Sequence, residues 1–198
     1  TIYLLGLGFG WGGTNCAWGE RGGKARDSGV FLHARGPDGN SEDGGGAFMA
    51  AIECNVFQGA TGDFLLIRGR NEDGTLIAPR LTARVSPEKD REGWFTWKED
   101  GERRTLSRWG RVNWRGKDPE WKDVLDFRGR QDVERPGWNR LDCVCRDGTI
   151  ELRVNGVTVN RAMEVWPDSG RILLQCEGSE IFYRNIRLEP LESVESVK

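Results

Sequence analysis

The sequence predicts an all-β protein built as a sandwich of two antiparallel sheets. Of its 198 residues, 28 are glycine and nine are tryptophan, and no long apolar stripe recurs with the 3.6-residue period of a helix. The dipeptides Asp147-Gly148 and Asn155-Gly156 are typical of tight hairpin turns, which need positive φ at both central residues. Between them, Ile150, Leu152 and Val154 alternate with polar residues, the pattern of a half-buried strand.

The remaining elements follow from similar short runs, and no segment reads securely as a helix. Residues 1–5 begin inside an apparent strand, and alternating side chains predict further strands over 27–35 and 48–56. In the C-terminal third, we expect four strands joined as an antiparallel meander. They cover residues 141–145, 150–154, 171–175 and 181–188.

The stretch from Arg84 to Glu134 is the least regular part of the chain. It is densely charged but too aromatic for disorder, because its tryptophans supply the apolar area that disordered segments lack. We therefore expect a long excursion of short strands and loops packed on one domain spanning residues 1–198. Asp118-Pro-Glu-Trp121 predicts a turn within it, and Trp138, just before a strand, is expected to be structural.

Charge and hydropathy exclude several function classes. The net charge is −2 and the pI is about 5.6, which gives no electrostatic case for nucleic acid or an anionic membrane as a partner. No apolar run reaches the roughly 18–20 residues of a membrane-spanning helix. The oligomeric state is left open. No signal peptide can be read from residues 1–5, which lack a charged segment and a cleavage site.

Five cysteines leave at least one thiol unpaired. Cys143 and Cys145 lie on the same strand face as Leu141, and Cys54 shares a face with Ile52, so these three are expected to be small buried apolar residues. Cys143 and Cys145 lack the Cys-x-x-Cys spacing of zinc ribbons and redox motifs. A disulfide remains an alternative, with Cys16 the freest candidate.

Strand parity gathers polar side chains on one face. On the strand 27–35, His33 and Arg35 point to the opposite side from the apolar residues Val30 and Leu32. On the next strand, Glu53 and Asn55 point to the opposite side from Ile52 and Cys54. In a two-sheet sandwich one face of each sheet fills the core and the other is free. We expect His33, Arg35, Glu53 and Asn55 to share the free face. The alternative is an ordinary solvated face with cross-strand ion pairs.

Several motifs, in order, resemble one known family. Those near the end of the chain are Gly137-Trp-Asn-Arg-Leu141, Val154-Asn-Gly156, Gly170-Arg-Ile-Leu-Leu-Gln175 and Phe182-Tyr-Arg-Asn-Ile-Arg-Leu188. Upstream are Asp27-Ser-Gly-Val-Phe-Leu-His33, Ile52-Glu-Cys-Asn55 and Gly62-Asp63. Together they are similar to the 3-keto-disaccharide hydrolase family. The resemblance implies a concanavalin-like jelly-roll sandwich, a small carbohydrate or glycoside as substrate, and export to the periplasm or outside the cell. A first strand paired with the last is common in such folds.

The resemblance also implies a reaction, namely removal of the C2 proton of a 3-keto glycoside followed by elimination and hydration. Glu53 and His33 are the candidate base and acid, with Glu53 preferred as base and the order left open. Arg35 is a candidate clamp for the enolate or a hydroxyl. No cofactor is assured, but a divalent metal held by His33 and Glu53 is a minority alternative that would polarise the ketone.

The sequence departs from the family pattern at two places. Asp27 stands where Asn is usual, and Glu177 follows Cys176 where the family often has a His-Gly pair. Glu177 is either a second acid or base or a solvated turn residue, and Asp27 is either a substrate contact or a turn former.

Aromatic and oxygen-rich segments leave further alternatives. Trp97, Trp109 and Trp114 either stack on sugar rings or pack as satellite core. The loop 36–46 is rich in oxygen ligands but lacks the spacing of a calcium-binding EF-hand loop, so we expect a flexible loop near the site. The paired carboxylates of ordinary glycosidases are absent around Glu53. The alternative function is a lectin-like module that binds carbohydrate without cleaving it.

Overall fold

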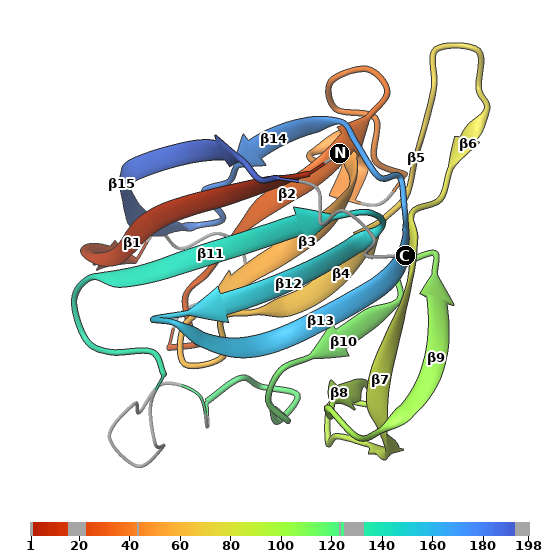
Figure 1. Cartoon of the computed structure of the whole chain (residues 1–198). Helices are drawn as coiled ribbons and strands as arrows, with labels where there is room; N and C mark the ends of the chain where they lie inside the picture. Colours follow the sequence, from red (N-terminus) through yellow and green to blue (C-terminus); the bar gives the residue numbers. More distant parts are fainter. Residues whose placement is uncertain (1, 16–22, 43, 123, 125–132, 193–198) are drawn as a thin grey trace.

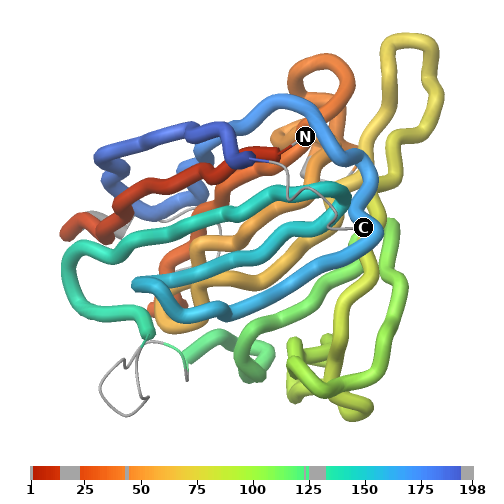
Figure 2. Tube along the Cα trace, viewed as in Figure 1, coloured from red at the N-terminus to blue at the C-terminus, as the bar shows by residue number. Residues whose placement is uncertain are grey.

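A computed structural model describes residues 2–15, 23–42, 44–122, 124 and 133–192. The chain folds into two packed layers of strands, drawn as a ribbon in Figure 1 and as a trace in Figure 2. One short 3₁₀ turn at Gly44–Gly46 is the only helical element in these residues. The strands are β1 (Tyr3–Asn15), β2 (Asp27–Arg35), β3 (Ala50–Phe57), β4 (Asp63–Ile67), β5 (Gly69–Arg70), β6 (Leu76–Ile77), β7 (Arg80–Lys89), β8 (Phe95–Trp97), β9 (Glu102–Ser107), β10 (Arg111–Asn113), β11 (Asn139–Arg146), β12 (Thr149–Val154), β13 (Val157–Trp166), β14 (Arg171–Leu174) and β15 (Ser179–Pro190).

The two layers form one continuous hydrogen-bonded sheet that curls over on itself. Its order is β14-β2-β3-β4-β10-β8-β7-β13-β12-β11-β1-β15, with β9 paired to β7 and a separate β5-β6 hairpin. Figure 1 shows β11, β12 and β13 lying across β2, β3 and β4. All pairs are antiparallel except β10 with β8, which run parallel. This is the predicted all-β jelly-roll sandwich, with one parallel pair at the turn between its layers.

Alternating apolar side chains from both layers fill the space between them. The core includes Leu5 and Leu7 of β1, Leu32 of β2, Ile52 of β3 and Leu152 of β12, all almost fully buried. In each of these strands the next residue points to the outer face of its layer. The outer faces are where functional side chains can be placed.

The hairpin predictions of the C-terminal third are confirmed. Asp147 and Gly148 have φ of 47° and 74°, and Asn155 and Gly156 have φ of 50° and 85°, as a turn with two positive φ values requires. The four-strand meander is wrong, however. Residues 157–166 form an additional strand, β13, and β14 leaves this layer to pair with β2 in the other one. Local alternation cannot reveal this crossing, because it sets which face a side chain occupies and not which strand lies alongside.

The ends of the chain and the tryptophan-rich excursion agree with expectation. Strand β1 pairs with β15 on one side and with β11 on the other, so the first strand is not an edge. The excursion contributes β8, β9 and β10 to the sheet. The predicted turn at Asp118 is present, since the Trp121 amide donates to the Asp118 carbonyl oxygen at 3.1 Å.

Four cysteines of the described residues are free thiols. Cys54, Cys143 and Cys145 are buried free thiols, as expected, and Cys176 is an exposed free thiol. Cys16 lies outside the described residues. In the part of the chain that the structure describes, no helix is long and apolar enough to cross a membrane.

Candidate active site

The outer face of β2, β3 and β4 carries a row of polar side chains. Glu53 pairs across the ladder with Phe31 on one side and Leu65 on the other, and Asn55 pairs with Gly29 and Asp63. Because Val30, Ile52 and Cys54 of these strands belong to the core, their neighbours in sequence point outward. Glu53, Asn55 and Asp63 are nevertheless almost fully buried, so this face is covered and not freely solvated.

Gly29 makes room for the Glu53 carboxyl group. A Cβ atom at Gly29 would overlap Glu53 Oε1 and lie 2.5 Å from Gln175 Oε1. The φ of Gly29 is outside the left-handed region, so the lack of a side chain, not backbone freedom, is what the position requires. The carboxyl group therefore lies flat on β2 beside Gln175, which follows the end of β14.

Asn55 links two carboxyl groups at this point. Its Nδ2 donates to Asp27 Oδ1 at 2.8 Å and to Glu53 Oε1 at 3.3 Å. A third carboxyl group belongs to Glu177, which accepts a hydrogen bond from Gln175 Nε2 at 2.8 Å. The backbones of Glu177 and Asp27 form an isolated antiparallel β-bridge, which brings the two residues side by side. Asp27, Glu53, Asn55, Gln175 and Glu177 therefore form one cluster, called here the carboxyl cluster.

The pKa of Glu53 is raised from 4.5 to about 8. Burial is the main cause, because it disfavours the charged form, and the negative charges of Asp27 and Glu177 act in the same direction. The hydrogen bond from Asn55 and the charge of Arg111 oppose the rise. Glu53 is therefore largely protonated at neutral pH and titrates just above it.

Three polar atoms of the polar row and its apolar border have no partner among the described residues. They are Asn55 Oδ1, Gln175 Oε1 and Trp109 Nε1, each buried. Buried polar groups are normally hydrogen-bonded, so unpartnered ones mark a place for water or a ligand. Gln175 and Glu177 are only partly buried, so the carboxyl cluster is reached from their side.

Asp63 anchors the segment that covers the other end of the polar row. Its Oδ2 lies 3.0 Å from Arg111 Nη2 and 2.5 Å from Lys117 Nζ, and its Oδ1 accepts from the Trp114 amide at 2.6 Å. Lys117 is fully buried, with its ammonium group 4.2 Å from the centre of the Phe57 ring. Two cations and a backbone donor satisfy this carboxylate, so Asp63 holds the covering segment in place.

An apolar cluster borders the polar row at its opposite end. Phe31, Ala51 and Ile67 are buried on the same outer face, and Trp109 packs against them half-buried. Trp109 thus keeps its place as a candidate platform for a sugar ring. Trp97 and Trp114 pack against the main core instead, which favours their interpretation as satellite core.

His33 does not share the face of Glu53, and the prediction from parity is wrong here. A β-bulge between Leu32 and Arg35 gives His33 a φ of 57°. The imidazole lies edge-on to the core residue Tyr3, with ring centroids 5.9 Å apart, and its Nδ1 is 2.7 Å from the Pro167 carbonyl oxygen. Burial lowers the pKa of His33. One inserted residue moves every later side chain of the strand to the other face of the sheet. The alternation of apolar and polar residues in the sequence does not reveal such an insertion.

Arg35 is also placed away from the carboxyl cluster. It lies beyond the bulge, exposed, and donates to the Ser169 carbonyl and hydroxyl oxygens at 2.8 Å. Residues 36–42 of the oxygen-rich loop lie beside the β5-β6 hairpin, where Asn40 donates to the carbonyl oxygens of Arg35 and Arg70. The expected cluster of four thus reduces to Glu53 and Asn55.

The residues do not form the metal site considered from the sequence. His33 and Glu53 lie on opposite faces of β2 and β3 and cannot share an ion. In the described ranges, no group of three or more His, Cys, Asp or Glu side chains is arranged to hold one.

Sequence reasoning missed Gln175 and Arg111 as neighbours of Glu53. In the sequence, Gln175 is only the last residue of a motif at a strand end. Its side chain comes close to Glu53 because β14 pairs with β2, a pairing that the sequence does not predict. Arg111 lay within the irregular excursion. Its outward position on β10 follows from the pairing of Arg111 with Leu65, which no local pattern signals.

The fold and the placement of polar side chains define a jelly-roll sandwich protein with a buried carboxyl cluster on one outer face. The model of the 3-keto-alpha-glucoside-1,2-lyase-like domain family matches residues 14–189. The chain belongs to this family, and membership supports a carbohydrate-active role.

Two solved structures are distant likenesses of this chain. Sheep galectin-11, solved in complex with glycerol, is 10% identical with a TM-score of 0.42, over 94% of this chain and 88% of its own. A Parabacteroides distasonis protein described provisionally as a glycosyl hydrolase is 14% identical with a TM-score of 0.42, over 96% of this chain and 72% of its own. Neither likeness is close enough to bear on function. Among curated proteins, none matches the chain.

Proposed function

We propose that this protein cleaves 3-keto glycosides by elimination, with Glu53 exchanging the proton at C2. The observation that carries the proposal is the buried Glu53 carboxyl group, with a pKa of about 8, in a chain of the 3-keto-alpha-glucoside-1,2-lyase-like family. Perturbed pKa values of this kind are typical of groups that transfer protons in catalysis.

The chemistry requires few protein groups. A ketone at C3 acidifies the C2–H bond, so a carboxylate can take that proton while the C1–O bond breaks and the leaving oxygen is protonated. Water then adds at C1 and the proton returns to C2, which completes net hydrolysis; release of the unsaturated sugar before that step is the lyase outcome. A base with a pKa of about 8 is stronger than an ordinary carboxylate, and it is half-ionised at about pH 8, so a minor but usable fraction is ionised at neutral pH.

Other members of the carboxyl cluster, together with Trp109 of the bordering apolar cluster, supply the remaining roles in this proposal. Glu177 is the acid for the leaving oxygen, because it is partly exposed and lies on the open side of Glu53. The unpartnered Asn55 Oδ1 and Gln175 Oε1 accept from sugar hydroxyl groups. Trp109 offers a ring face, and its unpartnered Nε1 is a donor for a sugar oxygen.

The alternative is a lectin-like module that binds a sugar without cleaving it. The observation that favours it is the burial of Glu53, which is only 3% exposed and so lies behind Gln175 and Glu177. In that case the outer side chains bind the sugar, and the Glu53 carboxyl group does not reach C2.

The test uses a chromogenic 3-keto glucoside and its parent glucoside, with wild type and the isosteric variant Glu53→Gln. We expect release of the leaving group from the keto sugar only, at least 100-fold slower in Glu53→Gln, with unchanged sugar affinity. The matched control is Asp38→Asn, which removes an exposed carboxylate paired with Arg171 and leaves the rate unchanged. Binding without release in any variant supports the lectin-like alternative, and parallel reactions with chelator and with added divalent metal report any metal dependence.

A further inference from the structure

A stripe of glycines lies on the opposite outer face of the sandwich. Leu5, Leu7 and Phe9 of β1 point into the core, so the alternate positions, occupied by Gly6 and Gly8, point outward. Neither glycine has a left-handed φ, so the backbone does not require glycine there. Glycine inside a central strand weakens the sheet and commonly marks a close approach by another group or by a ligand.

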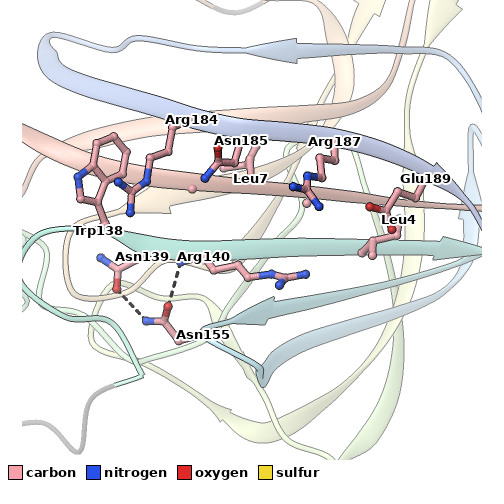
Figure 3. Close-up of a pocket in the computed structure, with 12 residues that line it drawn as sticks. Leu4, Leu7, Trp138, Asn139, Arg140, Asn155, Arg184, Asn185, Arg187 and Glu189 are labelled. Carbon is pink, nitrogen blue, oxygen red and sulfur yellow. Dashed lines mark hydrogen bonds between the residues drawn. The ribbon is translucent and has the colours of Figure 1, made fainter.

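Side chains of the two neighbouring strands, β11 and β15, form walls on both sides of these glycines, which form the floor. In the ladder, Gly8 lies between Arg140 of β11 and Arg184 of β15, and Gly6 is paired with Arg187 of β15. Figure 3 shows these arginine side chains along the two walls, with the Trp138 ring at one end. The resulting groove, called here the arginine groove, has a volume of about 360 Å³. That is within the range of about 300–1,000 Å³ typical of small-molecule sites.

Trp138 and Arg184 form a stacked pair at one end of the groove. Arg184 Cζ lies 3.9 Å from the centre of the Trp138 ring, and Trp138 is 43% exposed, so one face of the indole is held by the guanidinium while part of the ring remains accessible. The floor makes this possible, because a Cβ at Gly8 would lie 3.0 Å from Arg184 Cγ. A stacked guanidinium keeps its in-plane N–H groups free to bind a carboxylate through two parallel hydrogen bonds.

The groove has an excess of unpaired positive charge. Arg140 is neutralised by Asp142, with Nε 2.9 Å from Oδ2, but Arg184 and Arg187 make no ion pair with any residue that the structure describes. Among the described residues that line the groove, Glu189 is the one acidic residue, and the Asp142 carboxylate, which pairs with Arg140, lies beside the Gly6 floor. Two unpaired guanidinium groups therefore face one cavity in a protein whose net charge is −2.

Ordered carboxamide groups complete the lining. Asn155 Nδ2 donates to Asn139 Oδ1 at 2.8 Å, and Asn155 Oδ1 accepts from the Arg140 amide at 2.9 Å, as Figure 3 shows. Both carboxamides are held by protein partners, because Asn139 Nδ2 also donates to the Arg135 carbonyl oxygen and Asn155 Nδ2 to the Val133 carbonyl oxygen, so they fix the wall of the groove. The exposed indole ring of Trp138, the Asn185 carboxamide and the guanidinium groups are the side chains that suit a sugar ring, its hydroxyl groups and an attached carboxylate, respectively.

We propose that the arginine groove is a second saccharide site, which binds an acidic sugar bearing a carboxylate. It lies on the other layer from Glu53 and so acts as an accessory site that holds an acidic glycan. The sugar class rests on the carbohydrate-active role of the family, whereas the acidic group is inferred from Arg184 and Arg187. A nucleic acid fits less well, because the positive charge does not continue along the face: Arg153 and Arg161 both pair with Glu151.

The test is titration of the whole protein with trigalacturonate, and separately with neutral maltotriose and a short single-stranded oligodeoxynucleotide. We expect trigalacturonate to bind at least tenfold more tightly than either, and more weakly as salt rises. The double variant Arg184→Gln/Arg187→Gln should lose at least tenfold in affinity, and Trp138→Ala should weaken binding further. Arg153→Gln, whose guanidinium is paired with Glu151, is the matched control and should bind as wild type does.

Three outcomes would overturn the proposal. They are equal binding by the double variant and wild type, equal binding of maltotriose and trigalacturonate, or tighter binding of the oligonucleotide through the same arginines. Cleavage of a 3-keto glucoside is measured on the same variants and should be unchanged. Failure of the accessory site is thereby distinguished from failure of the catalytic proposal, which Glu53→Gln tests.

Discussion

Replacing Glu53 with glutamine should stabilise the protein, and increasingly so as pH rises. In the folded protein the Glu53 pKa is about 8, against an ordinary value of 4.5. Below about pH 4.5 the carboxyl group is protonated in both folded and unfolded chains and contributes no difference. Between pH 4.5 and 8 only the unfolded chain ionises, so the free energy of unfolding of the wild type falls as pH rises. Glutamine does not titrate and escapes this loss.

The magnitude follows from the size of the pKa shift. Each pKa unit corresponds to about 1.4 kcal/mol, so between pH 5 and pH 8 the wild type should lose about 3 kcal/mol relative to Glu53→Gln. Glutamine preserves the contacts, because its Oε1 can accept from Asn55 Nδ2 as the carboxyl oxygen does.

Urea unfolding of both proteins at several pH values between 5 and 8.5 measures this difference. Taking the difference removes the contribution of other groups, among them Glu134, whose pKa burial raises to about 7. Asp38→Asn, at an exposed position, should show no pH-dependent difference from wild type. A constant difference between Glu53→Gln and wild type across this pH range would refute the raised pKa, and with it the proposed base.

Further predictions concern the surroundings of Glu53. If its carboxylate is the base, kcat/KM should rise with pH to a plateau above about 8, and a falling profile would make Glu53 the acid instead. Gly29→Ala should reduce turnover at least tenfold, because the new methyl group overlaps Glu53 Oε1; unchanged turnover would show that the carboxyl position is not critical. Lys117→Met should lower the free energy of unfolding by about 3 kcal/mol in urea titrations, since it removes one of two cations from buried Asp63, and a loss below about 1 kcal/mol would contradict this. His33→Asn, which tolerates positive φ, should keep turnover within about threefold of wild type, and a 100-fold loss would return His33 to the catalytic site.

Much of the fold follows from short-range patterns in the sequence. The turns at Asp147-Gly148 and Asn155-Gly156 need residues that accept positive φ, and the alternation of residues 150–154 fixes which side chains meet the core. These features depend on a few consecutive residues, so they can be predicted from the sequence without knowing which strand lies alongside. The pairing of β14 with β2 joins residues more than 130 positions apart and has no local signal.

The candidate site was predictable only where its strands are regular. Glu53 and Asn55 lie on an uninterrupted strand and take the outward positions that parity predicts. His33 and Arg35 lie at a bulge, and His33 adopts a positive φ, which is uncommon for residues other than glycine. The cover over the polar row depends on Asp63 and Lys117, which are 54 residues apart in sequence. The glycine stripe of β1 is visible in the sequence, but its groove arises from the registers with β11 and β15.

Comparison of Asp63 with Glu53, two of the buried carboxyl groups, separates the needs of folding from those of function. Asp63 is explained by folding alone, because two cations and a backbone amide satisfy its charge and fix the covering segment. Glu53 has one hydrogen bond of 3.3 Å from Asn55 and two carboxylates nearby, and glutamine would serve its contacts at lower cost. A residue that destabilises the fold where an isosteric one would not is typical of a site that needs an exchangeable proton. The chemistry of this protein is therefore best sought at Glu53.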